Sequence, residues 1–135
     1  MGRRALVATG RTTAWATPLL DELTTQGIET YTFPIAGEPT TFTVREAVTN
    51  ARKARCDLVI GSGGGSALDA GKAAATLLTN DGDPQDFLEI IGKGKKLTQP
   101  SAPYIVMPTT AGTCSEVTPV QLTRDEMLQV LARAL

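Results

Sequence analysis

The chain has 135 residues and a formal net charge of −1, with 41% hydrophobic and 20% charged residues. A chain of this length can bury about two thirds of the surface that it exposes when unfolded, which is enough for one core. The near-zero net charge gives no electrostatic reason to expect a nucleic acid or an anionic membrane as partner. No run of about 18 apolar residues predicts a membrane helix.

The N-terminus and the cysteines bear on the compartment. Residues 1–4 lead into a predicted strand and not into the apolar region of a secretory signal. Without such a signal, Cys56 and Cys114 are expected to be reduced thiols. We therefore expect a single domain over residues 1–135 in the cytoplasm.

The first half of the chain alternates between a strand pattern and a helix pattern. An apolar strand is expected over residues 5–9 and a second strand over residues 29–33. Between them, Thr17 is expected to cap a helix that has Pro18 at its first position and ends at Gly27. The residues of its buried stripe would be Leu19, Leu20 and Leu23.

The alternation continues beyond these elements. Residues 43–46 form a capping box that predicts a helix through Ala54, buried through Val44, Val48 and Ala51. Strands are expected over residues 58–60 and 104–107, a helix over residues 67–78, and a last helix from a second capping box at residues 123–126. This order predicts an α/β, Rossmann-like, three-layer domain with a mainly parallel sheet.

A glycine-rich loop follows the third predicted strand. Four of the five residues 61–65 are glycine, and a helix is predicted directly afterwards. Glycines allow a ligand to approach main-chain N–H groups, and a helix N-terminus adds unpaired donors and a positive dipole end. The loop therefore indicates a nucleotide-binding turn. It is not a Walker A loop, because Ala73 follows Lys72, nor the dinucleotide fingerprint, because Ser66 replaces its third glycine.

A second loop, over residues 108–113, also follows an apolar strand. In open parallel sheets, ligands bind beyond the carboxyl ends of the strands, where the strand order switches direction. We therefore expect the two loops to converge on one ligand. Backbone N–H groups from both could share the charges of a pyrophosphate.

Together the two loops resemble the paired signature of the iron-containing (group III) alcohol dehydrogenases. The first motif is Gly63-Gly64-Gly65-Ser66-x-x-Asp69-x-x-Lys72, and the second is Pro108-Thr109-Thr110-Ala111-Gly112-Thr113-x-Ser115-Glu116. The resemblance extends over residues 4–118 and includes Ala8-Thr9-Gly10 and Gly37-Glu38-Pro39-Thr40.

This resemblance implies that the chain binds NAD or NADP. The cofactor-binding residues that it implies are Gly63, Gly64, Gly65, Ser66, Asp69, Thr109, Thr110 and Thr113. The glycines and the serine would contact the pyrophosphate, the aspartate would lie on the nicotinamide side, and the threonines would contribute hydroxyl groups. From the residues alone, an ion pair between Asp69 and Lys72 is the alternative for the aspartate, and turn or cap formation is the alternative for the threonines.

Two departures from the family pattern concern the cofactor. NAD-preferring members carry an aspartate after the second strand, whereas residues 32–34 here are Thr-Phe-Pro. NADP is therefore allowed, but no clear arginine partner demands it. In addition, Cys114 stands where the family usually has glycine, which would strain the second loop if that position needs a positive φ.

The metal of the family is not expected here. Members have a larger helical C-terminal domain that supplies an aspartate and, usually, three histidines to a divalent metal. This chain contains no histidine, and its cysteines and carboxylates lack the ligand spacing of zinc or iron sites. Residues 119–135 resemble the closing amphipathic helix of the family, which suggests an internal deletion. Truncation followed by unrelated sequence is the alternative.

These features predict a minimal NAD(P)-binding oxidoreductase that interconverts small alcohols and aldehydes or ketones weakly and without a metal. Losing the Lewis acid would lower the rate on the order of 10³-fold or more, and no catalytic residue can be assigned. The alternative is a non-catalytic dinucleotide-binding remnant, or a partner subunit of a full-length homologue. Apolar surface exposed by the loss of a domain would favour a homodimer.

Overall fold

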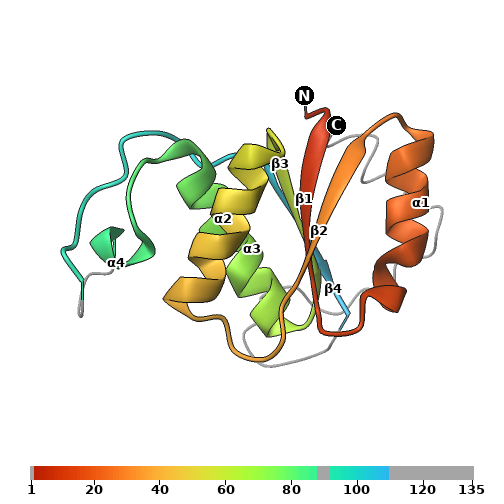
Figure 1. The fold of residues 1–135 in the computed structure, drawn as a ribbon, viewed down its shortest axis with the longest axis horizontal. Helices are drawn as coiled ribbons and strands as arrows, with labels where there is room; N and C mark the ends of the chain where they lie inside the picture. The colour runs from red at the N-terminus through yellow and green to blue at the C-terminus, as the bar shows by residue number, and fades with distance from the viewer. Residues whose placement is uncertain (1, 88–91, 110–135) are drawn as a thin grey trace.

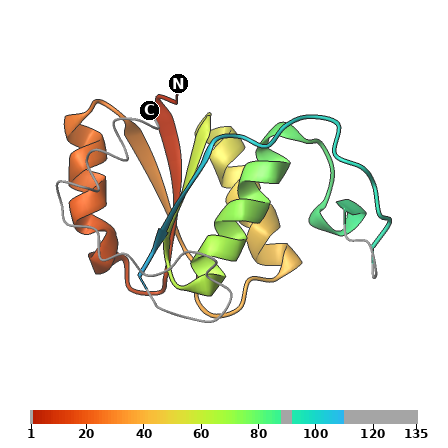
Figure 2. The same cartoon turned by 180° about the vertical axis from the view of Figure 1, so that it is seen from behind.

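The computed structural model describes residues 2–87 and 92–109. Its sheet has four parallel strands in the order β2–β1–β3–β4. The strands are β1 (Arg4–Thr9), β2 (Glu29–Pro34), β3 (Leu58–Gly63) and β4 (Tyr104–Pro108). Helix α1 (Thr17–Thr25) covers one face of the sheet, while α2 (Thr41–Lys53) and α3 (Gly65–Thr79) cover the other (Figures 1 and 2). The predicted three-layer α/β fold is confirmed.

Each face of the sheet has its own core. Along β1, Ala5 and Val7 belong to the cluster that contains Leu19 and Leu23 of α1, whereas Leu6 belongs to the cluster under α2 and α3. Because both faces are covered, β1 is a continuous apolar run and not an alternating one. Every residue of β3 is buried as well. The two clusters pack the central strands β1 and β3 between the helical layers.

The start of α1 differs from the prediction. A short 3₁₀ helix, η1 (Thr13–Ala16), leads directly into α1, so that Ala16 is the N-cap and Thr17 is already helical. The predicted cap at Thr17 is therefore wrong. The predicted end is confirmed, because Gly27 has a φ of +75° just beyond the helix.

The start of α2, the end of β3 and the start of α3 also differ from the prediction. The N-cap of α2 is Thr40, whose Oγ1 accepts a hydrogen bond from the N–H of Thr43 at 3.1 Å, so the capping box predicted at residues 43–46 is wrong. Strand β3 continues to Gly63 because residues 61–63 pair with β4, and α3 begins at Gly65 instead of residue 67. A single turn, α4 (Pro84–Phe87), was not predicted. The last predicted helix lies outside the described residues.

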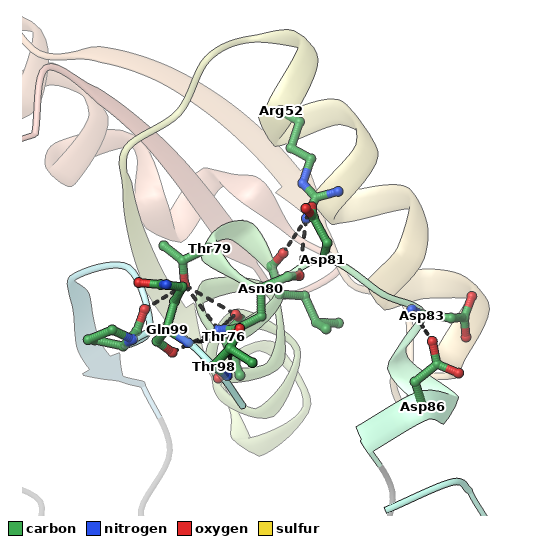
Figure 3. A network of polar contacts seen from close by, with 11 residues as sticks. Arg52, Thr76, Thr79, Asn80, Asp81, Asp83, Asp86, Thr98 and Gln99 are labelled. Atoms are coloured by element: carbon green, nitrogen blue, oxygen red, sulfur yellow. Dashed lines mark hydrogen bonds and ion pairs between the residues drawn. The ribbon is translucent and has the colours of Figure 1, made fainter. Parts of the chain in front are cut away.

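A polar network closes the amino end of the sheet (Figure 3). Asn80 follows α3 and is only 2% exposed. Its Nδ2 donates to the carbonyls of Thr76 and Gln99 at 2.9 Å, and its Oδ1 accepts from the N–H groups of Thr98 and Gln99 at 3.0 and 2.9 Å. Arg52 donates to the carbonyl of Asn80 at 3.2 Å. This network fixes the segment that leads into β4.

Two features of the structure bear on the expectations about a membrane helix and about the cysteines. In the described part of the chain, none of the helices is both long and apolar enough to cross a membrane. Cys56 is a free, buried thiol, and burial raises its pKa above the ordinary value. Cys114 lies outside the described residues.

Candidate functional site

A cleft of about 220 Å³ opens at the carboxyl edge of the sheet. It is lined by the loops that follow β1, β3 and β4, together with η1. The lining residues are Thr9, Gly10, Arg11, Thr12, Trp15, Ala16, Ser62, Gly63, Gly64 and Thr109. The cleft lies between β1 and β3, where the strand order changes direction, because β2 follows on one side and β4 on the other. This is the place where open α/β sheets bind their ligands.

The close approach of two loops explains the glycine at position 63. A Cβ on Gly63 would lie 2.9 Å from the Cβ of Ala67 and 3.0 Å from the backbone nitrogen of Gly10. The carbonyl of Gly63 also accepts a hydrogen bond from the N–H of Thr109 at 2.9 Å. Gly63 therefore joins all three loops through its backbone, and no side chain fits there.

The N-terminus of α3 opens beside the same cleft. Its N-cap is Gly64, which offers no side chain to the helix, and its first turn carries no acidic residue. In the described residues, the carbonyl of Gly64 accepts from the N–H groups of Ala67 and Leu68, at 3.0 and 3.1 Å. The N–H groups of Gly65 and Ser66 directly follow Gly64 and have no intrahelical acceptor, as at the start of any helix. An anion is favoured at such an end.

An unsatisfied hydroxyl lies at the base of the cleft. Thr9 ends β1, is 1% exposed, and its Oγ1 has no hydrogen-bond partner among the described residues. Polar groups of this kind are usually paired in folded proteins. Three features together fit a site for a phosphate-bearing ligand: the Thr9 hydroxyl without a partner among the described residues, the lack of room for a Cβ at Gly63, and the start of α3 without a side-chain cap.

The structure brings some of the predicted site residues together. Gly63, Gly64 and Thr109 line the cleft, and Gly65 and Ser66 begin α3 next to it. A Cβ on Gly65 would meet open space, in contrast to Gly63. Thr110 and Thr113, which the resemblance also implied, lie outside the described residues.

Asp69 does not line the cleft at the glycine loop. It lines a second cavity, of about 350 Å³, on the side of α3 that faces α2. The other lining residues are mostly apolar or hydroxyl-bearing: Pro39, Thr40, Thr41, Val44, Ala73, Thr76, Leu77, Pro84 and Phe87. Asp69 and Lys72 are not among the ion pairs of the described residues. The second cavity thus begins one turn beyond the helix end that opens on the first.

Tyr104 holds α3 against the strands behind the glycine loop. Its hydroxyl donates to the carbonyl of Leu68 at 2.6 Å, and its ring fills the space beside Gly61 and Gly71. A Cβ on Gly71 would lie 2.9 Å from that hydroxyl oxygen. Burial, and secondarily the negative charge of Asp69, raises the pKa of Tyr104 to about 12. The side chain therefore stays protonated and acts as a packing element.

Among the described residues, the donor set does not fit the iron of the resembled family. The sequence contains no histidine. Within residues 2–87 and 92–109, histidine, cysteine, aspartate and glutamate side chains form no group of three that could hold a metal ion. We therefore derive no chemical step through a metal for this chain.

Two residues of the cleft were missed at the level of sequence. Arg11 was not among the predicted site residues, yet it lines the cleft and is the one charged side chain among the described residues that line it. Trp15 lines it too and is 80% exposed. A tryptophan four residues after an arginine, directly behind the first strand, was the available signal. Its meaning depends on β1 and β3 being neighbours, which the strand order establishes.

Comparison with protein families and curated proteins gives consistent matches. A family model described as iron-containing alcohol dehydrogenase matches residues 1–130. Long-chain-alcohol dehydrogenase 1 of Geobacillus thermodenitrificans is 46% identical over 88 residues, which are 65% of this chain and 22% of the relative. The probable alcohol dehydrogenase EutG of Salmonella typhimurium is 42% identical over 121 residues, which are 87% of this chain and 30% of the relative.

Solved structures agree. Sulfoacetaldehyde reductase from Bifidobacterium kashiwanohense, solved in complex with NAD⁺, is similar with a TM-score of 0.65 and 30% identity, over 82% of this chain and 29% of that one. The chain thus spans less than a third of the length of these three relatives.

Proposed function

The chain belongs to the iron-containing alcohol dehydrogenase family, and on this premise we propose that its cleft holds NAD or NADP as part of an oxidoreductase. The observation that carries the proposal is the junction at Gly63. Three strand ends meet there without room for a side chain, and a helix N-terminus without a side-chain cap opens beside them. Such an arrangement matches the needs of a pyrophosphate.

In this proposal the bound cofactor extends from the cleft to the second cavity. The N–H groups of Gly65 and Ser66 would bind the pyrophosphate at the start of α3. The adenosine would lie in the cleft behind β1, and the nicotinamide would lie toward Asp69 and the second cavity. We further propose that Thr109, Thr110 and Thr113 donate hydroxyl hydrogen bonds to the cofactor. The apolar lining of the second cavity suits the carbon chain of a small alcohol, aldehyde or ketone.

When bound, the nicotinamide supplies or accepts the hydride. The residues described here would orient it and shield it from water. A substrate oxygen would have to receive its hydrogen bond from a hydroxyl or a water molecule, because the sequence offers no histidine. We propose that turnover by this chain alone is weak and independent of a metal.

A non-catalytic role is the second candidate, and one observation favours it. Arg11 is the one charged side chain among the described residues that line the cleft, so this part of the lining offers no carboxylate, histidine or thiol for acid–base catalysis. In this role the chain would bind the dinucleotide, or pair with a copy of itself or with a full-length homologue, without turnover.

Oxidation of NADH and NADPH, followed at 340 nm with a panel of small aldehydes and ketones, separates the two roles. Turnover by the pure chain that persists in EDTA supports a minimal enzyme. A Gly65→Asp variant controls for contaminating dehydrogenases, because a carboxylate at this helix end should repel the pyrophosphate. Cofactor binding without turnover in the parent would assign the chain to the non-catalytic class and end the enzymatic proposal.

A further inference from the structure

We propose that two copies of this chain pair through β2, antiparallel to one another, so that their sheets join into one. β2 is an edge strand, because among the described strands it pairs with β1 alone. In Figure 1 it lies in front of β1, with α1 to one side and α2 to the other, and none of the helices crosses it. The outer side of β2 is therefore accessible to a partner strand.

The backbone of β2 determines which of its groups face outward. The N–H of Glu29 donates inward, to the carbonyl of Arg3 at 3.0 Å, and the N–H of Ile35 donates to the carbonyl of Thr9 at 2.8 Å. Successive residues of a strand turn their N–H and C=O groups to opposite sides, and an edge strand presents every second pair to solvent. The residues of β2 that face outward are therefore Thr30, Thr32 and Pro34.

These outward groups fit a second copy of the same strand. When Thr30 faces Thr32 of the partner subunit, both residues exchange N–H···O=C bonds, and the two-fold axis repeats the pair to give four hydrogen bonds. A shift by two residues would bring in Ile28 or Pro34. Neither can complete such a pair, because the N–H of Ile28 already donates to the carbonyl of Leu23 at 2.9 Å and proline has no N–H.

The same register brings compatible side chains together. Tyr31 is 37% exposed and would face Tyr31 of the partner subunit across the two-fold axis, where aromatic cross-strand pairs stabilise a sheet. Glu29 would face Phe33 of the partner subunit, and its carboxylate pairs with Arg4 at 2.8 Å in its own chain. The register therefore opposes no two like charges, which would weaken a self-pairing strand.

β2 also lacks the features that usually protect an edge strand. Such strands are commonly guarded by lysines, by bulges or by a covering segment. Residues 29–33 contain no lysine, and they pair with β1 in unbroken register. The one proline of the strand, Pro34, stands at its last position and ends the pairing without interrupting it.

This interface does not involve the proposed dinucleotide site. The cleft lies between the ends of β1 and β3, and none of its lining residues comes from β2. Because the paired strands run antiparallel, the two clefts would lie at opposite ends of the joined sheet, each open to its ligand. The dimer and the dinucleotide site can therefore fail independently.

Sedimentation velocity of the pure chain over a concentration series tests the proposal. We expect monomer and dimer in exchange, with a dissociation constant on the order of 10–100 μM, because an edge-strand interface is small. Tyr31→Lys should weaken the dimer at least about tenfold, since it sets two ammonium groups against each other at the axis, whereas Tyr31→Phe should retain it. Val106→Lys is the matched control, because Val106 is an exposed residue of the other edge strand, β4. Circular dichroism checks that each variant is folded.

Cross-linking tests the register, in a chain that carries Cys56→Ala and Cys114→Ala. Residues that face each other without hydrogen bonds in an antiparallel pair have Cα atoms about 4.5 Å apart, within the range of a disulfide. Tyr31→Cys should therefore give a disulfide-linked dimer under mild oxidation. Thr32→Cys is the control, because its copy would lie two residues further along the partner strand, at roughly 8 Å and beyond that range.

The outcomes are distinct from those of the proposed function. A chain that stays monomeric up to about 1 mM would overturn the dimer. A dimer that persists in Tyr31→Lys, or one that is lost in Val106→Lys, would place the interface elsewhere and overturn the role of β2. Cross-linking of Thr32→Cys in place of Tyr31→Cys would overturn the register. Absence of dinucleotide binding in the parent would overturn the proposed function and leave this interface standing.

Discussion

At the amino edge of the sheet, side chains satisfy the ends of the backbone, whereas at the carboxyl edge a glycine leaves the start of α3 without a side-chain cap. Asp57 accepts hydrogen bonds from the N–H groups of Arg3 and Arg4, at 3.1 and 3.0 Å, and Asn80 closes the end of α3 (Figure 3). Partial burial alone would raise the pKa of Asp57, but these N–H groups hold it below its ordinary value. Across the sheet, α3 begins at Gly64 without a side-chain cap.

One small domain thus has backbone ends bound by side chains at its amino edge and open backbone N–H groups at its carboxyl edge. Strands and α3 connect the two edges, so the hydrogen bonds of one edge fix the geometry of the other. Donors left open at the carboxyl edge are then positioned for a ligand without the motion that would otherwise be needed. Substitutions at the amino edge should therefore affect stability, and substitutions at the carboxyl edge should affect binding.

The largest effect on stability is expected from Asn80→Ala. The change leaves the N–H groups of Thr98 and Gln99 and the carbonyl of Thr76 without their buried partner. The loss should be about 3 kcal/mol of unfolding free energy, measured by urea denaturation. Cofactor affinity of the folded fraction should change little.

The matched control is Asn50→Ala, at a helix position where the side chain forms none of the hydrogen bonds found among the described residues. Alanine favours helix there, so stability should be unchanged or slightly higher. A loss in Asn80→Ala no larger than in the control would contradict the assignment of the network to stability.

A smaller effect on stability, with a large one on binding, is expected from Gly63→Ala. Because the new Cβ would meet Ala67 and the backbone of Gly10 at 3.0 Å or less, the loops must separate. We expect a cost of about 1–3 kcal/mol and a loss of dinucleotide affinity, measured by thermal unfolding and by titration.

Gly65→Ala is the comparison for this prediction, since its Cβ would meet open space. Its stability should lie within about 0.5 kcal/mol of the parent. If both alanine variants behaved alike, the close approach at position 63 would not be what requires glycine there.

The smallest effect is expected from Tyr104→Phe, which removes the hydrogen bond to the carbonyl of Leu68 at a cost of about 1 kcal/mol. The pH dependence is more specific. The pKa of Tyr104 is raised to about 12 in the folded protein, against about 10 when unfolded. The unfolded chain then loses this proton first, so stability is fully present below pH 10 and falls between pH 10 and pH 12.

Denaturation at a series of pH values measures this dependence. The phenylalanine variant should lose less stability than the parent between pH 10 and pH 12. Parallel curves for the two proteins would show that Tyr104 does not titrate differently on folding.

Sequence patterns predicted the strands, the layers and the glycine loop because these follow from local periodicity and composition. Helix caps were harder to place, since Thr40 and Thr43 are both good capping residues and the backbone between them decides. Arg11 and Trp15 were missed for a different reason. They become site residues only when β1 lies beside β3, and this contact joins segments about 50 residues apart. No local pattern contains that information.

Dinucleotide binding to the parent chain and to two variants at position 65 is the most direct measurement. Gly65→Asp and Gly65→Asn differ by one charge in nearly the same volume, and both side chains would start in open space. Isothermal titration should give a dissociation constant for NADPH or NADH that changes little in the asparagine variant and rises at least about tenfold in the aspartate variant. Equal affinities for the two variants, or no binding to the parent, would contradict a pyrophosphate site at the start of α3.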